Sequence, residues 1–210
     1  MKGIIVVDIQ GDFTQLMSGT LAVAGTGLDY LNKISKTIDQ IKEAGIPVWA
    51  SQDWHPADHV SFFTNHPGKK AFDLIDIDGK EQVLWPPHCV QETSGAELLI
   101  EPSLFEAVVQ KGKDRRYDSY SCFQDDGGAE TELHGWLRQR GIGTLALLGI
   151  ATDYCVRYSA LDGLARGYRI AVIKSLCRGV DPETSARALR EIQVQGGVLF
   201  EDPDEFLGSD

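Results

Sequence analysis

Several features that would place a chain of this length in a familiar class are missing. Its 210 residues include four cysteines but no CxxC pair and no small-domain disulfide framework, so we expect reduced thiols. The longest apolar run near the start, residues 4–7, is too short for a signal-peptide core or a membrane span. Basic residues are in deficit, and a net charge of −11 argues against nucleic-acid and anionic-membrane partners. These absences predict a cytoplasmic protein with no nucleic-acid and no membrane partner.

The chain also lacks internal repeats, low-complexity tracts and linkers. Its length suffices for a substantial core, so we expect a single domain over residues 1–210. Residues 61–82 show no sustained periodicity and are interrupted by asparagine, proline and glycine. They predict a long loop insertion, and loops of that length in compact domains are usually lids or binding elements.

What is present is an alternation of apolar, β-branched runs with helical patterns. The runs lie at residues 3–7, 47–51, 107–110, 144–148, 169–173 and 197–200. The helical patterns cover residues 28–44, 131–140, 154–166 and 182–193. This alternation predicts a three-layer α/β/α domain around a six-stranded, mainly parallel sheet, with the strands in the order 3-2-1-4-5-6.

Chemically active residues recur at the carboxyl ends of the predicted strands. Asp8, Asp53, Lys111 and Cys155 each fall at or just past the end of a different strand, where one crevice can collect them. Taken singly, each has an ordinary explanation, since an aspartate often caps a turn and a lysine is usually solvated. Four such positions in one chain favour a common site.

Cys155 follows the most continuous of the apolar runs. The helical pattern of residues 154–166 places it in the first turn of a helix. Unpaired N–H groups there favour a thiolate and can hold an oxyanion. A lone cysteine is more commonly a small buried hydrophobe, so the position alone does not decide between the two.

Histidines gather in two short segments. Asp53 and His55 project to one side of an extended segment, and two prolines stiffen the backbone that presents His88. Carboxylate and imidazole ligands suit zinc, manganese or iron(II). With His59, three of the five histidines lie in these segments, which favours a metal site over separate surface roles.

Several motifs in a fixed order carry a resemblance over nearly the whole chain. They are Asp8, DWHPADHVSF at 53–62, WPPHCV at 85–90, Lys111-Gly112, DSYSCF at 118–123 and GIATDYCV at 149–156. Together they resemble the nicotinamidases of the isochorismatase-like cysteine hydrolases. The residue after the Ser-Tyr-Ser segment, usually small, is Cys122 here.

The resemblance implies a catalytic triad. Cys155 would be the nucleophile, Asp8 the general base and acid, and Lys111 the third member. The N–H groups of Ala151 and Cys155 would form the oxyanion hole, next to a cis peptide bond between Ile150 and Ala151. The reaction would convert nicotinamide to nicotinate and ammonia.

The resemblance also implies one divalent metal ion, zinc before manganese or iron(II), which binds the pyridine nitrogen. Its ligands would be Asp53, His55 and His88, whereas His59 matches a position that is a ligand in some relatives only. Phe13, Trp85 and Ile150 would contact the substrate, with Phe13 and Trp85 at positions that match aromatic residues near the family pocket. Acceptance of pyrazinamide and assembly into a homo-oligomer are left open.

Three other hypotheses compete with that of a nicotinamide hydrolase. A relative that hydrolyses a carbamoyl or ureido compound would share the triad but generally lacks the Asp53, His55 and His88 set. Isochorismate-cleaving members do not need a cysteine nucleophile. A non-catalytic thiol sensor with a structural metal would require a closed site with four protein ligands, and only three candidates are evident.

Overall fold

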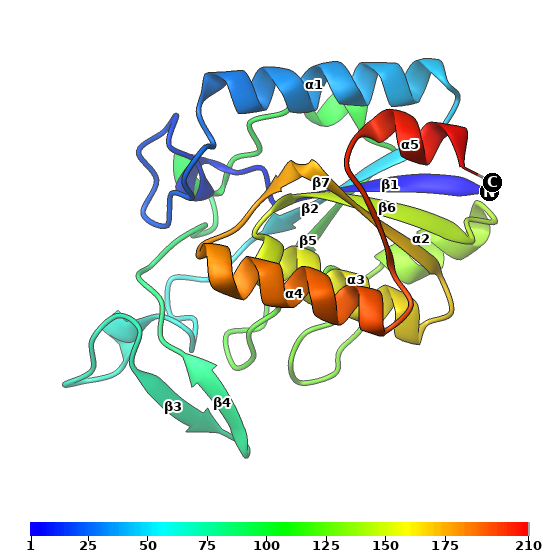
Figure 1. The fold of residues 1–210 in the computed structure, drawn as a ribbon. Coiled ribbons are helices and arrows are strands. Elements are labelled where there is room, and N and C mark those ends of the chain that lie inside the picture. The colour runs from blue at the N-terminus through cyan, green and yellow to red at the C-terminus, as the bar shows by residue number, and fades with distance from the viewer. Residues whose placement is uncertain (210) are drawn as a thin grey trace.

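The fold is built on an open, all-parallel sheet. The computed structural model describes residues 1–209, and within them six strands pair in the order β5-β2-β1-β6-β7-β8 (Figure 1). These strands are β1 (Lys2–Val7), β2 (Val48–Asp53), β5 (Val108–Lys111), β6 (Thr144–Ile150), β7 (Arg169–Arg178) and β8 (Val198–Phe200). Counted along the chain without the separate hairpin, this is the predicted order 3-2-1-4-5-6, which is therefore confirmed.

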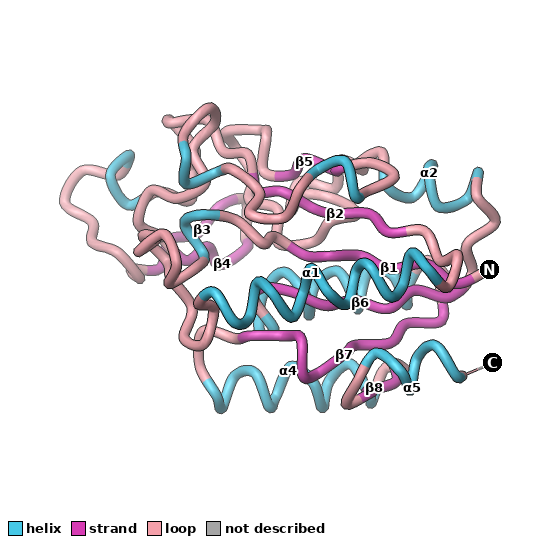
Figure 2. Tube along the Cα trace, turned by 90° about the horizontal axis from the view of Figure 1, so that it is seen from above, coloured by secondary structure: helices cyan, strands magenta, loops and turns pink. Residues whose placement is uncertain are grey.

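Helices cover both faces of the sheet, as predicted. One face carries α1 (Leu28–Glu43) and α5 (Pro203–Gly208), and the other carries α2 (Leu133–Gln139), α3 (Arg157–Ala165) and α4 (Pro182–Val194) (Figures 1 and 2). Helix α5 was not predicted. It has only six residues, too few for a helical period to be visible in the sequence.

Two apolar cores lie on the two faces of the sheet. Strand β1 contributes to both, because successive side chains of a strand point to opposite sides. Ile4 and Val6 pack in the core under α1, whereas Ile5 and Val7 pack in the core that includes Leu133 of α2. This two-sided burial explains why the central strands read as continuous apolar runs.

The long loop predicted at 61–82 contains regular structure in its second half, which was not predicted. Strands β3 (Leu74–Ile77) and β4 (Lys80–Val83) form an antiparallel hairpin that projects from the body of the molecule (Figure 1). Asp78 and Gly79 at its tip have φ values of 53° and 82°. An Asp-Gly pair is a strong hairpin signal when alternating apolar residues flank it, but here only the first flank, with Ile75 and Ile77, alternates.

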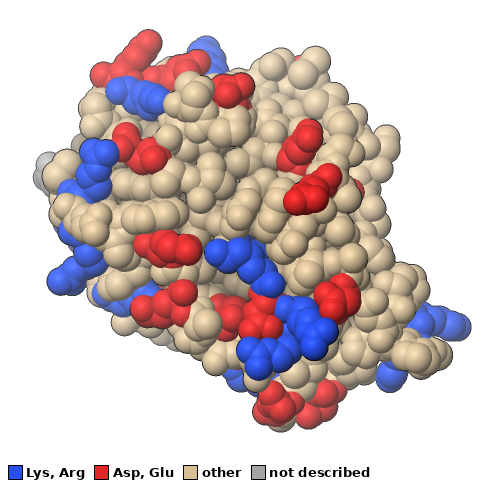
Figure 3. All heavy atoms as spheres, turned by 180° about the vertical axis from the view of Figure 1, so that it is seen from behind, with Lys and Arg blue, Asp and Glu red and all other residues tan. Residues whose placement is uncertain are grey.

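The described residues include no helix long and apolar enough to cross a membrane. On the face seen in Figure 3, acidic and basic side chains are intermixed around broad uncharged areas. That face therefore offers no continuous basic surface of the kind that binds a phosphate backbone.

Candidate active site

A pocket of about 390 Å³ opens at the carboxyl edge of the sheet. Cys155, Asp53 and His88 line its buried part, together with Ile150 and Ala151. Phe13 and Trp85, the two predicted ring-packing residues, also line it. The candidate substrate contacts predicted from the sequence therefore lie around one cavity, at the edge where open α/β sheets bind ligands.

Lys111 lies at the centre of the buried polar groups. Its Nζ is 3.0 Å from Asp8 Oδ2 and 3.4 Å from Cys155 Sγ, and it also ion-pairs with Asp53. Its fourth neighbour is the carbonyl oxygen of Ser119, at 2.9 Å. The ammonium group therefore joins the three residues that the sequence placed at separate strand ends.

Burial changes the protonation of this cluster. Burial opposes the charge on Lys111, but Asp53 and Asp8 outweigh it and raise the pKa of Lys111 well above its usual value. Burial raises the pKa of Asp8, although Lys111 lowers it. Burial likewise raises the pKa of the Cys155 thiol well above its usual value, against the lowering effect of Lys111. The raised pKa favours the thiol over the thiolate, so the nucleophile needs a base beside it.

The backbone around Cys155 also differs from the prediction. Cys155 lies in a π-helical turn, Thr152–Val156, that precedes α3, rather than in the first turn of an α-helix. The wider turn adds a residue to the helical path, and such turns are frequent at functional sites. The predicted cis peptide bond between Ile150 and Ala151 is confirmed.

Asp53 connects the triad to a second group of polar residues. It is the last residue of β2 and stands in register with Lys111, the last residue of β5. Gln10 fixes its backbone: the Gln10 side chain donates to Asp53 O at 2.8 Å and accepts from Asp53 N at 2.8 Å. Burial opposes ionisation of Asp53, but Lys111 and His55 outweigh it and lower its pKa. Sequence reasoning did not assign Gln10 a role.

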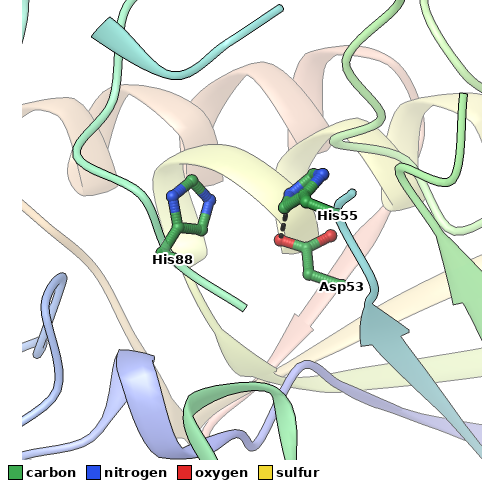
Figure 4. A group of neighbouring side chains, drawn as sticks. All are labelled: Asp53, His55 and His88. Atoms are coloured by element: carbon green, nitrogen blue, oxygen red, sulfur yellow. Dashed lines mark ion pairs between the residues drawn. The ribbon is translucent and has the colours of Figure 1, made fainter. Parts of the chain in front are cut away.

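Asp53, His55 and His88 are brought together as predicted. One potential ligand atom from each lies within 4.8 Å of the others, and the two imidazoles face the carboxylate (Figure 4). Nδ1 of His55 donates to Gly112 O at 3.1 Å, and Nδ1 of His88 donates to Pro86 O at 2.8 Å. Nε2 of His55 lies 3.6 Å from Asp53 Oδ2, and Nε2 of His88 makes no hydrogen bond with the described residues. Nδ1 bonded to a carbonyl with Nε2 facing the candidate ion is the usual arrangement behind a metal-binding histidine.

The surroundings of these histidines fit a metal ion. Burial and His55 lower the pKa of His88 to about 4, which leaves the neutral imidazole that a metal requires. Burial opposes the charge on His55, but Asp53 outweighs it and raises the pKa of His55, so a metal ion would have to displace that proton. Gly112 has a φ of 67°, and a Cβ there would lie 2.3 Å from the ring of His55. The glycine of the Lys-Gly pair is therefore required for the position of His55.

His59 belongs to a neighbouring group. Its Nε2 donates to Tyr117 O at 3.1 Å, and Nδ1 lies 2.7 Å from the hydroxyl of Ser61. A ring nitrogen of His59 lies within 4.8 Å of potential ligand atoms of His55 and Asp118. Both ring nitrogens of His59 thus have protein partners, unlike those of His88.

Asp12 is a further residue that sequence reasoning missed. Its Oδ2 accepts a hydrogen bond from the backbone N–H of Cys89 at 2.8 Å, directly after His88. Cys89 has a φ of 45°, a sparsely populated conformation for a side chain of this kind. The carboxylate thereby holds the turn that presents His88. Its sequence signal was weak, because an aspartate near a strand end usually serves a turn.

Comparison with known proteins agrees with this geometry. The isochorismatase domain model matches residues 2–201. A nicotinamidase of Escherichia coli (strain K12) is 41% identical over 204 residues, which cover 95% of this chain and 94% of the relative. The chain therefore belongs to the isochorismatase family.

Two solved structures resemble this isochorismatase-family chain over almost its full length. An Acinetobacter baumanii nicotinamidase and pyrazinamidase superposes with a TM-score of 0.87 at 39% identity, covering 97% of each chain. A Pyrococcus horikoshii pyrazinamidase in complex with zinc has a TM-score of 0.78 at 33% identity, covering 95% of this chain and 98% of the other.

Proposed function

We propose that this isochorismatase-family chain hydrolyses nicotinamide to nicotinate and ammonia through a thioester on Cys155. The observation that carries the proposal is the meeting of Cys155, Lys111 and Asp8 beside the pocket that Asp53 and His88 also line. The similarity to proteins named nicotinamidases supports the same reaction. Nucleophile, base and binding pocket then occupy one edge of the sheet.

Asp8 transfers the protons in the first half of the reaction. As Cys155 Sγ attacks the carboxamide carbon, Asp8 takes the thiol proton; burial raises the pKa of Asp8, which makes its carboxylate a stronger base for this step. The N–H groups of Ala151 and Cys155 hold the oxyanion. Asp8 then protonates the departing nitrogen, the C–N bond breaks, and ammonia leaves a thioester behind.

Water completes the cycle. Asp8, again a carboxylate, removes a proton from a water molecule that attacks the thioester carbon. The C–S bond breaks, nicotinate forms, and the proton returns to the sulfur. Lys111 remains charged throughout, because the carboxylates of Asp53 and Asp8 stabilise its ammonium form. Its positive charge offsets the negative charge that develops nearby.

The proposed cofactor is one divalent metal ion held by Asp53, His55 and His88. When bound, it orients the substrate through the pyridine nitrogen. Zinc is our first choice, supported by the zinc complex of the Pyrococcus horikoshii relative and by the histidine and carboxylate ligands. Phe13, Trp85 and Ile150 are proposed to pack around the ring.

The proposal extends to a second substrate and to the domain organisation of the chain. Pyrazinamide is a second candidate substrate, supported by the pyrazinamidase activity named for two relatives. A ureido substrate and a thiol-sensor role fit less well, because Asp53, His55 and His88 form a three-residue group beside the nucleophile. We further propose that the chain is a single domain whose insertion at 61–82 carries the hairpin.

Ammonia release from nicotinamide by the purified protein, with and without a chelator, tests this function. Cys155→Ala should abolish release, whereas Cys177→Ala, which changes a buried cysteine outside the pocket lining, should retain it. Iodoacetamide should first label Cys155, since it is the one cysteine among the described residues that line the pocket. Undiminished turnover by Cys155→Ala would contradict the proposed nucleophile.

A further inference from the structure

Phe72 is an aromatic residue in an unusual position that the proposed reaction leaves without a role. It lies just before strand β3, lines the pocket, and is nevertheless 62% exposed. Its φ is 71°, a conformation that is uncommon for any residue with a Cβ and an outlier for a bulky one. An exposed aromatic ring held in a strained conformation calls for an explanation by function.

Hydrogen bonds on both sides hold this conformation. The N–H of Phe72 donates to Leu84 O at 2.6 Å, and the N–H of Leu84 donates to Asp73 O at 2.8 Å. The Asp73 carboxylate accepts from the N–H of Lys70 at 2.9 Å. The turn is therefore fixed to the strand that leads to Trp85, and glycine would fit its backbone with less strain.

The strained turn directs the ring onto a wall of the pocket. Phe72 meets Trp85 edge to face, with centroids 5.9 Å apart. Trp85 is itself fixed, because its Nε1 donates to the hydroxyl of Tyr120 at 2.9 Å and its ring contacts Tyr154 at 5.1 Å. Phe72 thus extends a rigid aromatic wall outward.

Exposure distinguishes the mouth of the pocket from its floor. Cys155 is 6% exposed and His88 is 5% exposed, whereas Phe72 and Val180 are 62% and 54% exposed. All four residues line the same pocket. Phe72 therefore stands at the opening, and Cys155 and His88 lie at the inner end.

The chemistry of the substrate determines which ring edge faces that opening, a step that rests on the proposed function. A nicotinamide ring is anchored twice, by its carboxamide at Cys155 and by its nitrogen on the side of Asp53 and His88. The ring carbon between these two anchors faces the floor. The opposite carbon, position 5 of the pyridine, must then face the mouth.

We propose that Phe72 is a specificity-determining residue that contacts the position-5 edge of the substrate ring. The contact between the Phe72 ring and the edge of the substrate ring increases the affinity for the substrate. The same contact excludes carboxamides that carry a substituent at position 5. The pocket would therefore accept pyridine carboxamides that carry no bulky group at position 5, the carbon that faces the mouth.

Three variants test this inference. Phe72→Ala removes the ring, and Phe72→Gly also relieves the backbone conformation. Leu74→Ala is the matched control, because Leu74 lies on the same hairpin, is 50% exposed and is not among the residues that line the pocket. Each would be assayed with nicotinamide and with 5-methylnicotinamide, and nicotinate binding would be measured at equilibrium.

Removal of the ring should change affinity and selectivity. Phe72→Ala should raise KM for nicotinamide and weaken nicotinate binding by about 2- to 10-fold, with little change in kcat, as expected for one aromatic contact. The kcat/KM for 5-methylnicotinamide relative to nicotinamide should rise by about 10-fold or more. Phe72→Gly should show the same losses without a fall in Tm, since the backbone strain is relieved.

The results separate this inference from the proposed function. Wild-type protein that released no ammonia from nicotinamide would refute the proposed function itself. Active wild-type protein whose Phe72→Ala and Leu74→Ala variants had equal selectivity would refute only the role of Phe72. A fall in Tm of Phe72→Gly that accounted for its lost binding would also refute it, by showing a purely structural residue.

Discussion

The triad and the metal-binding group lie side by side, yet the fold holds them in different ways. Asp8 follows β1, Lys111 ends β5, and Cys155 follows β6, so the sheet itself brings the triad together. His55 and His88 lie in loops and are held by backbone carbonyls and a glycine contact. Asp53 belongs to both groups, because it ends β2 and ion-pairs with Lys111.

This contrast suggests a division of labour. Groups that bond to the reacting atoms depend on strand register, which changes only if the sheet changes. Groups that orient the substrate depend on local loop contacts, which single substitutions can alter. Damage to the first should reduce kcat for every substrate, whereas damage to the second should reduce metal affinity and the preference for a pyridine ring.

The largest expected effect is on the triad. Asp8→Asn keeps the shape but cannot accept the thiol proton, so kcat should fall by about 10²–10⁴-fold, while nicotinate binding changes little. Lys111→Met should cause a loss of similar size, and the double variant should lose little more, because the two residues act as a unit. Turnover by Asp8→Asn within a few-fold of wild type would require another base.

Gly112→Ala should separate the two groups. The added Cβ would collide with His55, so metal affinity should fall by about 10–100-fold, as measured by competition with a chromophoric chelator. Hydrolysis of nicotinamide should approach that of benzamide, which lacks the ring nitrogen. The matched control is Gly141→Ala, with a φ of 66° and no atom within 4 Å of the added Cβ. Equal metal loss in both variants would show that backbone strain, not the contact, is responsible.

The structure also shows which parts were predictable from sequence. The strand-end positions of Asp8 and Lys111 follow from the continuous apolar runs that burial on both faces imposes. The strand order follows from the alternation of strands and helices, which favours parallel strands with right-handed crossovers. The Gln10 contact with Asp53 could not be predicted from the sequence. The Gln10 side chain bonds the backbone N–H and carbonyl of Asp53 in place of a neighbouring strand, and such a contact leaves no periodic pattern. The helix start left the protonation of Cys155 undecided for a similar reason, since the burial that raises its pKa depends on the assembled pocket.

A smaller effect is expected for Gln10. Gln10→Met would leave the backbone N–H and carbonyl of Asp53 without their buried partners, and should lower the free energy of unfolding by about 1–3 kcal/mol. Metal affinity should fall as Asp53 moves. The control Gln52→Met removes a donor at the same distance, 2.8 Å, from the carbonyl of Ala96 that Gln10 also contacts, but the Gln52 side chain makes no hydrogen bond to Asp53. Metal affinity unchanged by Gln10→Met would contradict the positioning role.

The smallest expected effect concerns Asp126, which belongs neither to the triad nor to the metal-binding group. Burial, with a contribution from Asp118, raises the pKa of Asp126 to about 6. The folded state therefore binds this proton more tightly, and the ionised carboxylate destabilises the fold as the pH rises from about 4 through about 6. Asp126→Asn should add about 1 kcal/mol of stability near pH 7.5, after allowance for solvent screening, and nothing near pH 4. Urea denaturation at both pH values measures this, and a gain that persisted at the lower pH would exclude the titration as its cause.

The sheet topology has a consequence for synthesis of the chain. Strand β1 occupies an inner position but pairs with β6, so Ile4 must wait for Ala146 to be made before that side is covered. Until then a nascent chain presents the unpaired edge of a strand whose residues 4–7 are all apolar, which is a template for association with other chains. Contacts so distant in sequence also form slowly. Since Asp8 and Cys155 follow these same two strands, the step that ends the risk of aggregation is the step that assembles the nucleophile with its base.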